Sequence, residues 1–163
     1  MTESVVTYIT DEMRASIGIW RDMRTSPPVS LSDIRKWAIA TYWPQQPPPI
    51  YWDAAYGAST QWQGIIAPPD FNPFAWSVEG VQLRNKRAKR PNGKPLNGMN
   101  GGQTETYGKP MRPGDVITAR SRLTDWNERM GRFGLTLYTT TEIEWRNQNG
   151  DFVKRKISIS IRH

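Results

Sequence analysis

The feature that most constrains the fold is a two-residue alternation of apolar and polar side chains over the last third of the chain. Runs with this period begin at Ile117, Leu135 and Val153. Successive side chains of a strand point to opposite faces, so each run predicts a strand with one buried and one solvated face. The predicted buried face of the third run carries Val153, Arg155, Ile157, Ile159 and Ile161.

Turn signals separate these runs. Asn149-Gly150 predicts a tight hairpin between the last two, and residues 113–115, Pro-Gly-Asp, predict a turn before the first. Residues 103–109 predict one more strand. Four sequential strands with short connections predict an antiparallel meander, whose apolar face a helix must cover.

Charged side chains fall on the polar side of the second run. Glu142 and Glu144 alternate there with Arg146. This pattern predicts solvated cross-strand ion pairs rather than acid–base chemistry. Asp115 is expected to hold the turn in which it lies.

The first half of the chain predicts helices and loops, which makes the fold class α+β. Ser30 and Asp33 resemble a helix cap ahead of apolar residues spaced along one helical face. That helix must end by Trp43, because a proline follows. A short helix is expected near Asp11, and another over 53–62 with its first residue as the cap.

Composition excludes several kinds of site. Without cysteine the chain forms no disulfide and no thiolate site, and its single histidine, His163, is the last residue. We therefore expect no metal site. No apolar run approaches the roughly 20 residues of a membrane span, and residues 1–10 lack the pattern of a signal peptide. A single cytoplasmic domain over 1–163, with no membrane association, is expected.

Positive charge is concentrated in one segment. Lys and Arg number 22 against 15 Asp and Glu, a formal net charge of +7. The densest cluster overlaps a Gly/Pro/Asn-rich basic loop expected over 85–102 and comprises Arg84, Lys86, Arg87, Lys89, Arg90 and Lys94. Such a cluster is typical of a site that binds phosphates or of a solvated loop. No nucleic-acid-binding motif accompanies it, so nucleic acid is not an expected partner.

Several segments together resemble a known family. Residues 64–71, Gly-Ile-Ile-Ala-Pro-Pro-Asp-Phe, and residues 111–115, Met-Arg-Pro-Gly-Asp, are similar to motifs of the N-terminal-type domain of MaoC-like dehydratases, also called the FAS1-like dehydratase domain. Further similar segments are 34–38, 49–55, 101–103 and 147–150. The resemblance covers residues 30–162, and within it residues 72–96 do not align.

The resemblance implies a single hot-dog fold, an antiparallel sheet wrapped around a central helix. Such domains act on acyl groups held as thioesters of coenzyme A or acyl carrier protein, and add or remove water across the 2,3 bond. They work in pairs, so the implied partner is a catalytic MaoC-like hot-dog chain or a second copy of this one. No cofactor is expected, since the coenzyme A thioester is substrate.

The family's catalytic segment is altered. Catalytic members carry an Asp and, after four residues, a His, and the resemblance places Gln46 and Tyr51 at these positions. Hydration needs a base and an acid with pKa values near the working pH. An amide does not titrate, and the ordinary pKa of tyrosine is about 10. We therefore expect no catalytic residue here, and a non-catalytic, substrate-shaping subunit of a heteromeric enoyl-CoA hydratase or 3-hydroxyacyl-thioester dehydratase.

Aromatic side chains lie in or beside the stretch expected to enter the central helix. They are expected either to line a slot for a bulky acyl chain or to form core. The candidates for substrate binding are Tyr51, Trp52, Pro68, Phe71, Phe74 and Trp76. For the phosphates of coenzyme A the candidates are Arg84, Lys86 and Arg87.

Two alternatives remain open. In the first, the chain is an autonomous hot-dog hydratase, dehydratase or thioesterase, with Tyr51 as a hydrogen-bond donor and Asp53 or Asp70 as the base. In the second, it is a basic module that binds nucleic acid or an acidic protein, which rests on charge alone.

Overall fold

The computed structural model describes residues 6–76, 93–132 and 134–163. Its main element is a five-stranded antiparallel sheet in the order β1-β3-β4-β5-β2. The strands are β1 (Arg21–Thr25), β2 (Gly98–Tyr107), β3 (Thr118–Gly131), β4 (Gly134–Arg146) and β5 (Phe152–Arg162). The helices are α1 (Asp11–Ser16), α2 (Leu31–Tyr42), the 3-10 turn η1 (Pro49–Tyr51) and α3 (Ala54–Ser59).

The alternation correctly predicts β3, β4 and β5, which follow one another as a meander. The predicted position of the preceding strand is wrong, because β2 pairs with β5 at the far edge of the sheet and not with β3. β2 also begins at Gly98, inside the loop expected over 85–102. Gly101 allows this close pairing, since a Cβ there would lie 2.8 Å from the Ile159 side chain. The rest of the predicted loop lies mainly outside the described residues.

The predicted helix caps are present. The Ser30 hydroxyl accepts a hydrogen bond from the Asp33 backbone N–H at 3.0 Å, and α2 ends before Trp43 as predicted. The Asp53 carboxylate caps α3 by accepting from Ala55 and Tyr56 N–H at 2.9 and 3.0 Å. α3 ends at Ser59, earlier than predicted, where the helix gives way to turns.

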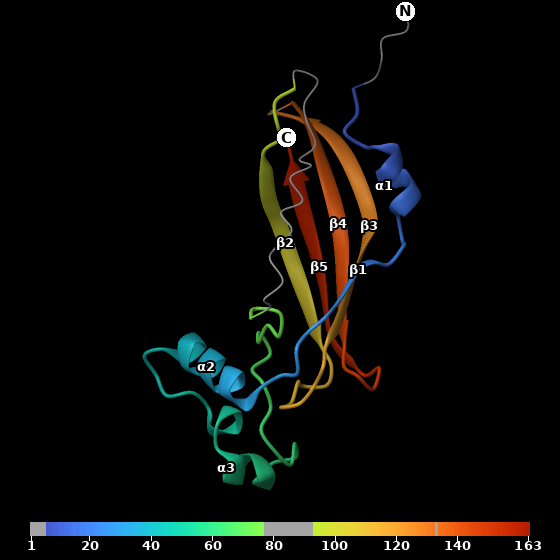
Figure 1. Ribbon diagram of the computed structural model, residues 1–163. Coiled ribbons are helices and arrows are strands. Elements are labelled where there is room, and N and C mark those ends of the chain that lie inside the picture. Colours follow the sequence, from blue (N-terminus) through green and yellow to red (C-terminus); the bar gives the residue numbers. More distant parts are fainter. Residues whose placement is uncertain (1–5, 77–92, 133) are drawn as a thin grey trace, which may run out of the picture.

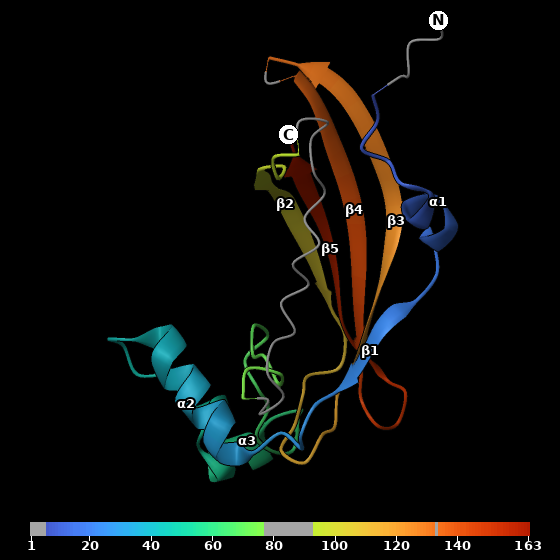
Figure 2. The same cartoon turned by 45° about the horizontal axis from the view of Figure 1, so that its top comes forward.

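Helices α2 and α3 gather beyond one end of the sheet rather than over its face (Figures 1 and 2), and α1 lies beside β3. The hydrophobic core sits at that same end. Loop residues such as Ile65 and Phe71 pack there on Ile117 and Val153 at the end of the sheet. Residues 71–76, expected beside a central helix, form turns in the core, and the chain that follows lies outside the described residues.

The predicted buried face of β5 is wrong. Trp145 faces Lys154, whereas Arg146 faces Phe152, so Val153 is an extra residue in the ladder. This bulge shifts β5 by one position, and a shift of one exchanges the two faces of a strand. Lys154 therefore shares the face of Trp145, while Ile157 and Ile159 lie on the opposite face, 41% and 39% exposed.

Glu142 and Glu144 form the predicted cross-strand pairs, but they are not solvated. Only 6% of Glu142 and 3% of Glu144 is exposed. Arginines surround both carboxylates: Arg120 and Arg146 bind Glu144, and Arg122 and Arg155 bind Glu142. Hydrogen bonds from Arg146 and Arg120 hold the pKa of Glu144 below its ordinary value despite burial. The network fixes the pairing of β3, β4 and β5.

Candidate functional site

Tyr51 is presented by a stiff segment. Residues 47–49 are three consecutive prolines, and the one-turn helix η1 ends at Tyr51. The Trp52 indole N–H donates to the Pro47 carbonyl at 3.0 Å, and this hydrogen bond within the segment stabilises its conformation. Burial, a hydrogen bond with Tyr42 and the nearby carboxylate of Asp70 raise the pKa of Tyr51 to about 12. The phenol is therefore protonated at neutral pH and cannot serve as a base.

Tyr51 lines a narrow, mostly apolar cavity of about 200 Å³. The segment with Ala67 and Pro68 forms one wall, held by a 2.8 Å hydrogen bond from Ala67 N–H to the Met111 carbonyl. The opposite wall comes from the end of β2 and the start of β5. The lining comprises Tyr51, Trp62, Ile66, Ala67, Pro68, Pro69, Tyr107, Gly108, Pro110, Met111, Val153 and Lys154.

Gln46 does not share this cavity. It lies with Trp52 in a separate groove formed by Tyr42 and the three prolines. The two side chains that the resemblance places at the family's Asp and His positions thus line different cavities. The carboxylates considered as bases in the autonomous alternative are also engaged, since Asp53 caps α3 and Asp70 accepts from Thr41 at 3.5 Å.

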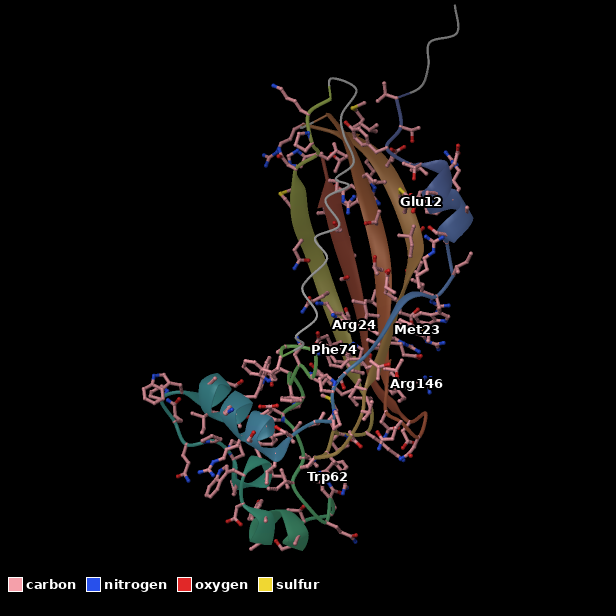
Figure 3. The ribbon with its side chains drawn as sticks, in the orientation of Figure 1. Glu12, Met23, Arg24, Trp62, Phe74 and Arg146 are labelled. Atoms are coloured by element: carbon pink, nitrogen blue, oxygen red, sulfur yellow. The ribbon has the colours of Figure 1, made fainter. Side chains whose placement is uncertain are left out.

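A second cavity, of about 350 Å³, lies over the sheet face that carries Trp145. Its lining mixes aromatic, cationic and acidic side chains: Arg24, Trp37, Asp70, Asn72, Glu105, Ile143, Trp145, Lys154 and Lys156. Figure 3 shows Arg24 beside Phe74 where β1 approaches the core, and Trp62 further down towards α3. The Arg24 guanidinium stacks on the Phe74 ring at 4.2 Å.

Lys154 lines both cavities. It is buried, and its Nζ lies 3.0 Å from a Glu105 carboxylate oxygen and 5.2 Å from the centres of the Tyr107 and Trp145 rings. Glu105 also accepts a hydrogen bond from the Tyr107 hydroxyl. Burial would raise the pKa of Glu105, but the hydrogen bonds from Tyr107 and Lys154 outweigh it and lower that pKa. The hydrogen bond to Glu105, with burial, raises the pKa of Tyr107 to about 12.

The predicted substrate-binding residues do not gather in one place. Tyr51 and Pro68 line the narrow cavity, and Trp52 lines the groove of Gln46. Phe71 and Phe74 are buried in the core, in edge-to-face contact with Trp37 and Trp145, whereas Trp76 is exposed. Arg84, Lys86 and Arg87, predicted to bind phosphate, lie outside the described residues.

Sequence reasoning missed Glu105, Tyr107 and Lys154. These side chains come from β2 and β5, which are separated by some 50 positions of sequence, and only the sheet order brings them together. Lys154 is one of four basic residues in residues 152–162, so no local sequence signal singles it out.

The sequence model of a protein family described as "FAS1-like, dehydratase domain region" matches residues 15–156. The chain belongs to this family. The MaoC-like dehydratase resemblance is thereby confirmed. A UPF0336 protein of Thermobifida fusca (strain YX) is a relative, 31% identical over 113 residues, which are 64% of this chain. The match spans 65% of the length of that curated relative.

Two solved structures of heteromeric complexes resemble this member of the FAS1-like dehydratase family. The ChsH1-ChsH2 complex from Mycobacterium tuberculosis matches with a TM-score of 0.66 and 20% identity, over 93% of this chain and 87% of that one. The HadBC (3R-hydroxyacyl-ACP dehydratase) complex from the same organism matches with a TM-score of 0.58 and 17% identity, over 89% and 96%. These likenesses confirm the hot-dog fold.

Across residues 6–76, 93–132 and 134–163, no group of three or more Asp, Glu or His side chains could hold a metal ion. In the same ranges, every helix is too short or too polar to cross a membrane.

Proposed function

We propose that this chain is the non-catalytic, substrate-shaping subunit of a heteromeric enoyl-CoA hydratase or 3-hydroxyacyl-thioester dehydratase. The chain contributes walls of the acyl-binding space. A second hot-dog chain contributes the Asp and His that activate water and protonate the α carbon.

The observation that supports this most directly is the state of Tyr51. It stands where the family's catalytic His is expected, yet its pKa of about 12 keeps it protonated. A base must be deprotonated at the working pH to accept a proton from water. Gln46, at the Asp position, has no titratable group and lies in a different groove.

The comparisons support a hot-dog partner. ChsH1-ChsH2 and HadBC are complexes of two different chains, as their names state. Among the residues that line the cavity of Tyr51 there is no Asp, Glu or His, and a partner's acid and base would complete such a site.

Reconstitution tests the proposal. The tagged chain is purified from its native host, the proteins that accompany it are identified by mass spectrometry, and a hot-dog partner with an Asp-x4-His segment is then expressed alone and with this chain. We expect no loss of enoyl-CoA absorbance with this chain alone and hydration by the pair. Hydration by the purified single chain would contradict the proposal.

The Tyr51→Phe variant tests whether Tyr51 only lines the cavity or takes part in the reaction. If Tyr51 only lines the cavity, the reconstituted pair that carries the variant should keep a kcat close to that of the unchanged pair, with any effect confined to KM. A catalytic hydrogen-bond donor predicts a loss of about 100-fold or more in kcat, and that result would contradict the non-catalytic role. Trp52→Phe, in the groove of Gln46, is the matched control.

A further inference from the structure

Six of the residues that line the cavity of about 350 Å³ belong to two neighbouring rows of side chains that run across the sheet. Register pairs align Tyr107, Lys154, Trp145, Ala119 and Arg24 in one row across five strands. The adjacent row aligns Glu105, Lys156, Ile143 and Ser121. Paired residues of adjacent strands lie within contact of one another on the same face. The charged side chains that β1, β2 and β5 contribute to this cavity are thus held in place by backbone pairing, whereas Asp70 comes from a turn.

Positive charge exceeds negative charge in this cavity. The cations are Arg24, Lys154 and Lys156, and the carboxylates are those of Asp70 and Glu105. Glu105 is occupied by Lys154 and the Tyr107 hydroxyl. Lys156 is half-buried, and within the described ranges it takes part in no ion pair, although its charge acts on Glu105. A partly buried, unpaired ammonium favours an anionic ligand.

The walls beside these charges are flat and apolar. Trp37 and Trp145 contribute indole rings and Ile143 an aliphatic surface. Phe74 packs edge-to-face on Trp145 at 5.5 Å and holds that ring in place. A cavity of about 350 Å³ falls at the lower end of the range for small-molecule sites. The flat side chains that line this cavity suit a ring system better than a thin alkyl chain.

We propose that this cavity binds the far end of the acyl group, and that this end is a carboxylate carried on a flat apolar body, with Lys156 as its counter-ion. The proposal rests on the proposed function, since it assigns the substrate class of that subunit. Lys154 lines both cavities, so the narrow apolar cavity and this one lie next to each other.

The phosphates of coenzyme A offer similar anionic oxygens. The carboxylates of Asp70 and Glu105 lie in the same cavity, and they repel a doubly charged phosphate more strongly than a singly charged carboxylate. The indole walls also provide contact for an apolar body, which a phosphate lacks. The structure therefore favours the carboxylate, and the experiment separates the two sources.

The binding test uses a matched pair of probes with the purified chain: 2-naphthoate, an anion, and 2-naphthamide, its neutral analogue. Binding is followed by tryptophan fluorescence and by NMR chemical shifts. We expect naphthoate to bind about tenfold more tightly, as one charge-assisted hydrogen bond predicts. Lys156→Gln should abolish this preference, and Lys156→Arg should retain it. Lys36→Gln, at an exposed lysine of α2, is the control and should retain it too.

Equal affinity for the two probes, or an unchanged preference in Lys156→Gln, would overturn the proposal. Displacement of naphthoate by free coenzyme A would assign the cavity to the coenzyme's phosphates and would also overturn it. In the reconstituted pair, an enoyl-CoA with a terminal carboxylate should be preferred over its methyl-ended analogue, and Lys156→Gln should lower only the former's kcat/KM. If no catalytic partner is found, the proposed function fails, but the probe titration still tests whether the cavity binds a carboxylate.

Discussion

Lys154 and Trp145 lie directly opposite one another on β5 and β4, with the Lys154 ammonium 5.2 Å from the centre of the Trp145 ring. The same ammonium binds Glu105 at 3.0 Å. An ammonium that leaves water is stabilised by a carboxylate and by ring faces together. This contact places charge in the part of the sheet where alternation predicts apolar packing.

Loss of the Lys154 ammonium should destabilise the fold more than loss of an equally short surface pair. Lys154→Met leaves Glu105 partly buried with Tyr107 as its remaining partner, and we expect about 1–3 kcal/mol less free energy of unfolding. Lys109→Met is the control, because Lys109 lies 2.9 Å from Asp151 but its side chain is 66% exposed, against 10% for Lys154. Urea denaturation measures both. Equal losses would show that burial of Lys154 has no energetic role.

Tyr51 and Tyr107 should ionise later than an ordinary tyrosine. Both pKa values are raised to about 12, Tyr51 chiefly by burial and Tyr107 chiefly by its hydrogen bond to Glu105. The folded pKa lies above the unfolded value of 10.0, so this stabilisation is complete below pH 10 and is lost as the pH rises through 12. In a phenolate absorbance titration, Tyr51→Phe and Tyr107→Phe should each remove absorbance only from the late phase. Removal of absorbance from the phase near pH 10 would contradict the assignment.

Glu144 should make stability depend on pH in the acid range. Hydrogen bonds from Arg146 and Arg120 lower its pKa below 4.5. Its contribution is therefore present above pH 4.5 and disappears as the pH falls through the lowered value. The difference in free energy of unfolding between the unchanged chain and Glu144→Gln should be large at pH 7 and should shrink towards pH 3. A difference that stays constant with pH would mean that the charge of Glu144 is not what stabilises the network.

Gly108 should not tolerate a side chain. A Cβ there would lie 2.3 Å from the Phe152 carbonyl oxygen, which is backbone and cannot move aside. We expect Gly108→Ala to cost about 1–3 kcal/mol, as overpacking commonly does. Gly98→Ala is the control, because a Cβ at Gly98 meets nothing within 4 Å. Thermal unfolding of both variants checks the prediction, and similar melting temperatures would contradict it.

The sequence was sufficient to predict β3, β4, β5 and the helix caps because these depend on local patterns, whereas β1 was not predicted. The alternation from Ile117 to Trp145 reports directly on β3 and β4, and Ser30 and Asp53 cap helices through backbone groups two or three residues away. The bulge at Val153 leaves no comparable signal. A one-residue change of register depends on pairing with β4, so the faces of β5 could not be assigned from its own residues.

The candidate site was only partly predictable for the same reason. The family resemblance indicated Tyr51, and the structure places it in a cavity. Gln46 is close to Tyr51 in sequence, yet a proline run directs it into another groove. The cluster of Glu105, Tyr107 and Lys154 depends on β2 crossing to the far edge of the sheet, and long-range strand order has no local sequence signature.

The bulge at Val153 determines which side chains of β5 lie on the same sheet face as Trp145. If Val153 were paired instead of bulged, continuing the pairing of Arg146 with Phe152 would place Trp145 opposite Val153 and Ile143 opposite Arg155. The lysines would then face outward and the isoleucines inward. The polarity of this sheet face therefore depends on whether one residue of β5 is paired or bulged, and not on which residues the strand contains.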